Sequence, residues 1–364
     1  MAIPFIIAGA AIAAAAFGGK KAYDGYQTKS EADDILESSK RRYDEKKEVL
    51  ESINVSTTTE LEKLGTLELK IGKSFNKFNT IAQSILKQLN ESGQDISISI
   101  PRHEINKIEN LAISATEYLG TLVGAGASSA AAGFAVYGGV MAFAAASTGT
   151  PIAALSGAAA YNATMAAIGG GSLATGGWGM AGGAMVLGGA VVAPILAIAG
   201  WAYNSHAEKA LDNAQKIRSE VNGAVAKMTL AYENLTKTKE YVVAIYHVLE
   251  AQFTVFKPYL LALIEADKMI QRNKALGQAN THGITDELKL TINNGYKLAA
   301  IMTNLITTPL FKPKLNQNNE AIIVDEVIEI ETDSHGLKIL NQECLDKRLD
   351  ETKRFTLSWW HHKS

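Results

Sequence analysis

Two stretches of the sequence differ most from the rest of the chain: YLGTLVGAGASSAAAGFAVYGGVMAFAAA, residues 118–146, and GMAGGAMVLGGAVVAPILAIAGWAY, residues 179–203. Both belong to residues 118–207, a run of 90 residues without Asp, Glu, Lys or Arg that holds 19 of the 31 glycines. A surface that faces water normally carries charged side chains. This uncharged run is therefore expected to be covered by lipid or by other helices of the protein.

The rest of the 364-residue chain carries all 35 basic and 37 acidic side chains, and the net charge is −2. Because there is no basic excess, the composition argues against a dedicated nucleic-acid binder. The single cysteine, Cys344, excludes an intrachain disulfide and a zinc site built from several cysteines. A small disulfide-stapled secreted module is excluded with it.

The uncharged run is predicted to form a hydrophobic helical hairpin. At about 1.5 Å per residue, residues 118–146 and 179–203 are each long enough to cross a hydrocarbon layer about 30 Å thick. Gly149, Thr150 and Pro151 are the predicted hinge, since Thr150 suits a helix cap and Pro151 a first helical position. Small residues at the predicted insertion and helix-packing positions would let two helices approach closely: Gly120, Gly124, Ala127, Ala131, Ala135, Gly139, Gly179 and Gly183.

The apolar content of the first stretch predicts a conditional span. Its strongly apolar side chains contribute only about −2 to −5 kcal/mol on an insertion scale, and its glycines and hydroxyl side chains offset part of that. A segment whose net insertion free energy is close to zero can be stable both when packed against protein and when inserted in lipid. The alternative is an Ala/Gly core that stays buried in a soluble bundle under the flanking helices.

Residues 1–19 form a second apolar stretch, predicted to be a helix in contact with a membrane. It has no positive charge before its apolar part, so a cleavable signal peptide is not expected. Lys20 and Lys21 follow it and would place the rest of the chain in the cytoplasm.

Charged helices flank the uncharged run, as residues 20–117 on one side and 208–312 on the other. A helix is predicted from Tyr23 to about Ile53, with an interruption at 56–59. A second helix then carries one apolar stripe: Leu61, Leu64, Leu67 or Glu68, Ile71, Phe75, Phe78, Ile81, Ile85 and Leu89.

Further along, the alternation of Ile96, Ile98 and Ile100 predicts a short strand, and a third helix is predicted from near His103. After the uncharged run, Pro258 is expected to kink or break the next helix, and another helix is predicted from Asp286 to about Thr307.

Residues 313–364 are predicted to be a strand-like segment, centred on 321–331, followed by a mixed-charge tail. The whole pattern predicts an all-α protein, an elongated bundle of long helices with the Gly/Ala-rich hairpin and a small β-like element near the C-terminus.

Motifs for enzymes and cofactors are not supported. Residues 177–182 match GxGxxG, but no strand precedes them and no acidic residue follows at the required spacing. His361 and His362 are interpreted as part of a solvated tail rather than a metal site. No catalytic residue, cofactor or metal ligand is predicted.

The layout resembles a widespread, poorly characterised class of bacterial proteins in which long charged helices flank a glycine-zipper hairpin. The residues that carry the resemblance are 146–153, 155–159, 169–174 and 207–211. In overall plan the chain is also similar to α-helical pore-forming toxins, which hide a hydrophobic hairpin in a helical bundle until it is triggered.

These patterns predict a non-enzymatic, membrane-active protein that inserts its hairpin and oligomerises, forming a pore or otherwise permeabilising a membrane. Its expected partners are a lipid bilayer and further copies of itself, with a protein partner on the charged helices and no nucleic acid. The expected location is the bacterial inner membrane, or the cytoplasm with conditional insertion. The alternative is a permanently anchored coiled-coil structural or signalling protein without pore activity.

Overall fold

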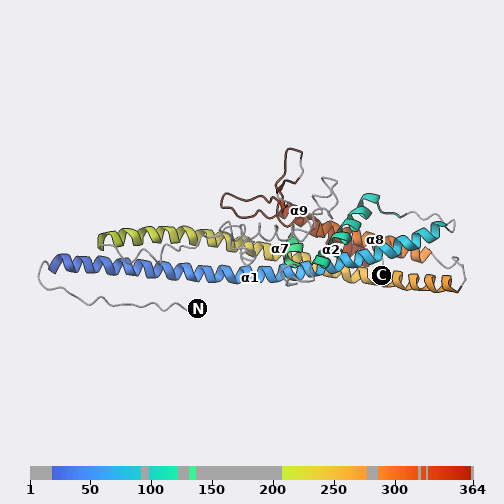
Figure 1. Cartoon of the computed structure of the whole chain (residues 1–364), viewed down its shortest axis with the longest axis horizontal. Helices are drawn as coiled ribbons and strands as arrows, with labels where there is room; N and C mark the ends of the chain where they lie inside the picture. Colours follow the sequence, from blue (N-terminus) through green and yellow to red (C-terminus); the bar gives the residue numbers. More distant parts are fainter. Residues whose placement is uncertain are drawn as a thin grey trace. The chain divides into compact units, whose positions relative to one another are not determined.

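The computed structural model describes residues 19–91, 98–121, 131–136, 207–276, 286–318, 321–324 and 327–361. Helix dominates these residues, as α1 (Gly19–Glu91), α2 (Arg102–Thr121), α7 (Ala207–Ala275), α8 (Asp286–Ile306) and α9 (Gln342–His361) (Figure 1). The predicted all-α class is confirmed. The predicted N-terminal membrane helix, residues 1–19, lies outside the described residues except for its last position.

The chain divides into two compact units. The first comprises Met1–Glu48 and Val192–Met228, and the second comprises Val49–Val191 and Thr229–Ser364. α1 and α7 each contribute to both units.

In the first unit, the described residues belong to α1 and α7 and bury few side chains. Those that are buried are mostly small: Ala32, Ser39, Ala214, Val221, Ala224 and Met228. Exposed ion pairs lie one turn apart on α1, Lys40–Asp44 and Arg41–Glu45, each at 4.0 Å. Exposed pairs of this kind add little to stability. The helical conformation of residues 29–48 therefore depends largely on the intrinsic helix preference of the sequence.

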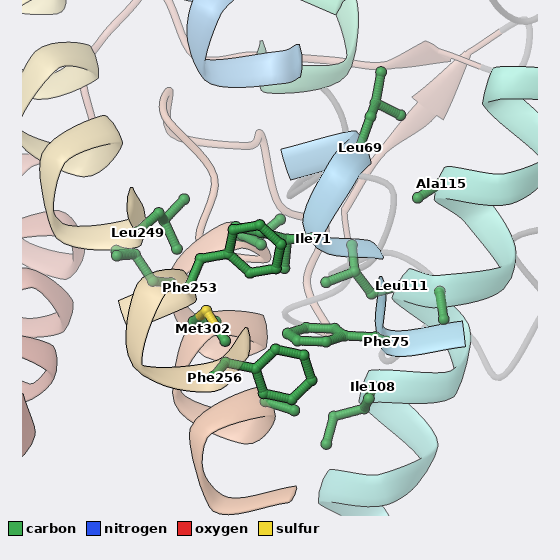
Figure 2. Packing of buried hydrophobic residues seen from close by; sticks show 14 of the residues in the cluster. Leu69, Ile71, Phe75, Ile108, Leu111, Ala115, Leu249, Phe253, Phe256 and Met302 are labelled. Carbon is green, nitrogen blue, oxygen red and sulfur yellow. The ribbon is translucent and has the colours of Figure 1, made fainter. Parts of the chain in front are cut away.

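The second unit has a continuous hydrophobic core, to which α1, α2, α7 and α8 all contribute. Phe75 and Phe78 of α1 both contact Phe256 of α7, with ring centroids 5.3 Å apart. Phe78 also meets Tyr296 of α8 edge to face at 5.2 Å. Figure 2 shows Phe75 beside the α7 aromatic side chains and near Leu111 of α2. A side chain at Gly295 would collide with the Phe78 ring, so glycine is what lets α8 approach.

The predicted interruption at residues 56–59 is wrong, because α1 is continuous there. The Thr57 hydroxyl donates a hydrogen bond to the Ile53 carbonyl at 2.8 Å, and the Thr59 hydroxyl donates one to the Val55 carbonyl at 2.9 Å. Threonine hydroxyls satisfied in this way no longer compete with the helix. Thr57 also lies 3.4 Å from the Leu235 carbonyl of α7, so tertiary packing holds this turn.

Of the predicted kink or break at Pro258, the break is wrong, because α7 continues through Pro258 to Ala275. The kink stays a prediction. Proline removes one helical hydrogen bond, at a cost of about 3 kcal/mol in a helix interior. Phe256 and Tyr259, on either side of it, are both buried. Their packing offsets the local penalty.

Residues 98–100 form no strand, contrary to the prediction, and Ile96 lies outside the described residues. The side chains of Ile98 and Ile100 instead pack against the core. The Pro101 carbonyl accepts hydrogen bonds from the amides of Glu104 (3.0 Å) and Ile105 (3.3 Å), which form the first turn of α2. α2 begins at Arg102, one residue before the predicted start near His103.

α8 closely matches its prediction, and acidic residues occupy its first turn, where they favour a helix start. Beyond it, β1 (Ile323–Val324) pairs antiparallel with β2 (Val327–Ile328). Isolated bridges continue the pairing, including Thr332 with Lys338 around a turn in which Gly336 has φ of 80°.

The tail then forms α9, a helix that the sequence analysis does not predict. It packs through a sparse stripe of side chains: Leu345, Leu349, Thr352 and Phe355.

Candidate functional site

Only part of the predicted hairpin lies within the described residues. Gly120 is in α2, and Ala131 and Ala135 are in the helical segment 131–136. The other predicted packing positions and the predicted hinge lie outside the described residues: Gly124, Ala127, Gly139, Gly179, Gly183, Gly149, Thr150 and Pro151. The candidate site is therefore built on residues 131–136 and the helices that contact them.

Residues 131–136 are packed into the core of the second unit. Ala131, Phe134 and Val136 are buried, and Ala132 and Ala135 are half-buried against the same cluster. The Phe134 ring lies 5.2 Å from the Tyr118 ring of α2, centroid to centroid. In this structure, helices of the same chain cover this piece of the uncharged run.

The contact with α1 depends on a glycine. A Cβ atom placed on Gly65 would collide with the carbonyl group of Ala131. Two turns along α1, a Cβ atom on Gly72 would collide with the Cβ atom of Ala115 in α2. Gly65 and Gly72 share one face of α1. The absence of side chains on that face lets residues 131–136 and α2 approach the α1 backbone closely. Ala131, predicted to pack helices in a membrane, here packs against α1.

Glu68 lies between these two glycines in sequence and on the same side of α1. Its side chain is 3% exposed, and its Oε2 atom has no hydrogen-bond partner. Burial raises the pKa of the Glu68 carboxyl well above its usual value. An ionised carboxylate without a partner is costly in such surroundings, so the site favours the neutral acid.

Sequence reasoning did not assign Glu68 a role, although the signal was present. Position 68 falls in the apolar stripe of α1, where Leu67 and Glu68 were alternatives. The structure buries Glu68, while Leu67 is half-buried. A charged residue in the middle of an apolar stripe is the pattern that predicts a buried titratable group.

A second polar cluster joins α1, α2 and α8. The Tyr296 hydroxyl donates to Asn79 Oδ1 at 2.7 Å, and Glu109 Oε1 accepts hydrogen bonds from Gln83 at 2.6 Å and Asn79 at 3.2 Å. Burial, and then the charge of Glu109, raise the pKa of Tyr296. Gln83, Glu109 and Tyr296 of this cluster also line a pocket of about 590 Å³.

Lys338 is another buried titratable residue to which the sequence analysis assigns no role. Burial lowers the pKa of its ammonium group to about 8. Its Nζ atom lies 5.9 Å from the centroid of the Phe311 ring and has no hydrogen-bond partner. Asn234 of α7 donates a hydrogen bond to the Lys338 carbonyl at 2.9 Å, which joins the C-terminal segment to α7.

None of the helices described combines the length and the apolar character that a membrane span requires. Within the same ranges, no group of three or more His, Cys, Asp or Glu side chains is placed to hold a metal ion. Comparisons with family models, with curated proteins and with solved structures give no match for this chain.

Proposed function

We propose that this chain is a non-enzymatic, membrane-active helical protein that inserts the uncharged run into a bilayer and oligomerises there, which permeabilises the membrane. The observation that carries the proposal is the run of 90 residues without a charged side chain. A run of that length needs a cover of protein or lipid. The packing of residues 131–136 against α1 and α2 supports protein as the cover in the state described here.

The energetics of the uncharged run support its transfer from contact with protein to contact with lipid. The insertion energy of residues 118–146, about −2 to −5 kcal/mol before offsets, is similar in size to the loss of one large core side chain. A modest loss of contact with α1 is then enough to shift the balance toward lipid. Small residues along the run would let inserted copies pack closely, which favours a homo-oligomer.

The resemblance to bacterial proteins with a glycine-zipper hairpin supports a location at the bacterial inner membrane, or in the cytoplasm before insertion. The competing function is that of a permanently anchored coiled coil, which would bind partners through its charged helices and leave the bilayer intact. Release of a trapped dye from vesicles separates the two, because only the first function predicts it.

The sharpest test places a charge inside the first predicted span. Val140→Arg adds an insertion penalty of up to about 2.5–3.5 kcal/mol, which cancels most of the estimated gain. We expect the variant to keep its helix content by circular dichroism and to lose dye release from phosphatidylethanolamine–phosphatidylglycerol vesicles.

Thr66→Arg is the control, since it adds the same charge at an exposed position of α1. It should release dye like the unmodified protein. Full dye release by Val140→Arg, or no release by the unmodified protein, would overturn the proposal.

A further inference from the structure

Glu68 lies on α1 between Gly65 and Gly72, the two glycines at which residues 131–136 and α2 approach this helix. It is three residues from Gly65, which touches the Ala131 backbone, and four residues from Gly72, which touches Ala115. Residues at these spacings lie on the same side of a helix. Its carboxyl group is buried there, and Oε2 receives no hydrogen bond. Buried polar atoms without partners are uncommon, and each calls for an explanation by stored strain, by a function, or by a bound water or ion.

Among the residues that the structure describes, no cation is paired with the Glu68 carboxyl group, and burial is the one cause of its pKa shift. Residues 131–136 contain no titratable side chain. The described titratable side chains of α2 nearest the contact are Glu109, which is bonded to Gln83 and Asn79, and Tyr118, which packs on Phe134. On α1 itself, Lys63 and Lys70 are exposed.

α7 contacts α1 on both sides of this level, through Leu235 at Thr57 and through Phe256 at Phe75. The titratable α7 side chains between these contacts are all at least partly exposed: Lys237, Lys239, Glu240, Tyr241, Tyr246, His247 and Glu250. Lys297 of α8 is exposed too. Burial is accordingly the cause of the shift in the pKa of Glu68.

We propose that Glu68 is a proton-operated latch for the uncharged run: its neutral carboxyl allows residues 131–136 to stay packed against α1, and its ionisation releases them. The inference rests on the proposed function, to which it adds the trigger for insertion. A charge at this position regains its hydration only when the contact opens. Release is therefore favoured as the pH rises, not as it falls.

Amide hydrogen exchange of the peptide that covers residues 131–136 tests the latch. The exchange rate at each pH is divided by that of the denatured chain at the same pH, which removes the intrinsic pH dependence. We expect this protection to fall by up to about tenfold per pH unit in the unmodified protein, over the range in which Glu68 ionises.

Glu68→Gln keeps the shape of the side chain and cannot ionise, so its protection should not change with pH. Glu68→Leu is a second neutral variant in case the amide disturbs packing, and it should behave in the same way. Glu62→Gln is the matched control, a half-buried glutamate on another face of α1, and it should follow the unmodified protein. Equal pH profiles for Glu68→Gln, Glu68→Leu and the unmodified protein would overturn the latch.

Dye release, measured on the same variants and over the same pH range, separates the latch from the membrane proposal. Release that rises with pH in the unmodified protein and in Glu62→Gln, but not in Glu68→Gln, supports both. A pH-dependent exchange without dye release at any pH overturns the membrane function and leaves the latch intact. Dye release with no dependence of exchange on Glu68 overturns the latch alone.

Discussion

α1 passes from a unit whose described residues bury few side chains to a unit with a continuous core, and its two parts are held by different interactions. Over residues 29–48, where its side chains are described, the buried ones are those of Ala32 and Ser39, and the ion pairs Lys40–Asp44 and Arg41–Glu45 are exposed. After residue 49, it buries large side chains such as Phe75 and Phe78, and it uses glycines to approach its neighbours. The same backbone conformation therefore does not imply the same stability or the same tolerance of substitution.

The largest difference between the two parts is expected for loss of an aromatic ring. Phe75→Ala removes a fully buried side chain that contacts Phe256, and should lower the free energy of unfolding by roughly 3–5 kcal/mol. Tyr43→Ala, in the first part, removes a half-buried ring and should cost much less. Urea unfolding followed by circular dichroism measures both. Equal costs would show that the first part depends on a core as the second does.

A change from glycine to alanine should have opposite signs in the two units. Gly65→Ala drives a methyl group into the Ala131 carbonyl, and should destabilise the second unit by about 1–3 kcal/mol. Gly223→Ala lies in the first unit, in α7, where the added methyl group would meet no atom within 4 Å apart from its own turn of the helix. It should stabilise its helix by roughly 0.5–1 kcal/mol. Thermal unfolding of the two variants gives the signs, and a stabilising Gly65→Ala would mean that residues 131–136 do not contact α1.

The pH dependence of stability should come from the second unit. Because the folded pKa of Glu68 is raised above its unfolded value, the folded state binds this proton more tightly. Stability is then greatest below the unfolded pKa and falls by up to about 1.4 kcal/mol per pH unit until the folded pKa is passed.

Glu68→Gln should remove this slope and so raise stability at the upper end of the range, whereas Glu45→Gln in the first part should leave the slope in place. Urea midpoints collected across pH provide the measurement. A slope that survives in Glu68→Gln would assign it to another group.

The smallest effect is expected for the exposed ion pairs of the first part. Glu45→Gln breaks the pair with Arg41, and both side chains are more than half exposed at 68% and 69%. The change in unfolding free energy should stay within about 0.5 kcal/mol and shrink further in high salt. A larger loss would indicate that these charges form a network rather than isolated pairs.

The sequence predicts the features of this fold that local patterns control. The all-α class, the start of α2 and the extent of α8 follow from helical periodicity and terminal residues such as Asp286. Local rules fail where tertiary contacts decide, as at Thr57, whose hydroxyl meets the Leu235 carbonyl, and at Pro258, which follows the buried Phe256. α9 escapes prediction because so few apolar side chains define its buried face.

The candidate site was predictable only in part, for the same reason. The sequence marks Ala131 as a packing residue and position 68 as part of an apolar stripe. It does not indicate that Gly65 is the residue that meets Ala131, because the two are far apart in the chain and no periodicity specifies which helix faces which. The proposed hinge and most of the small-residue row stay predictions, since they lie outside the described residues.

The burial of Glu68 also affects the order of events during synthesis. The ribosome makes α1 before residues 131–136, so Glu68 first lies in water, where a carboxyl group at neutral pH is ionised. A charge in the middle of an apolar stripe helps to keep the nascent helix hydrated while its partners are still missing. When residues 131–136 pack, the Glu68 carboxyl takes up a proton from solution at any pH between its unfolded and its folded pKa. The chain thus completes this contact through an uptake of hydrogen ions.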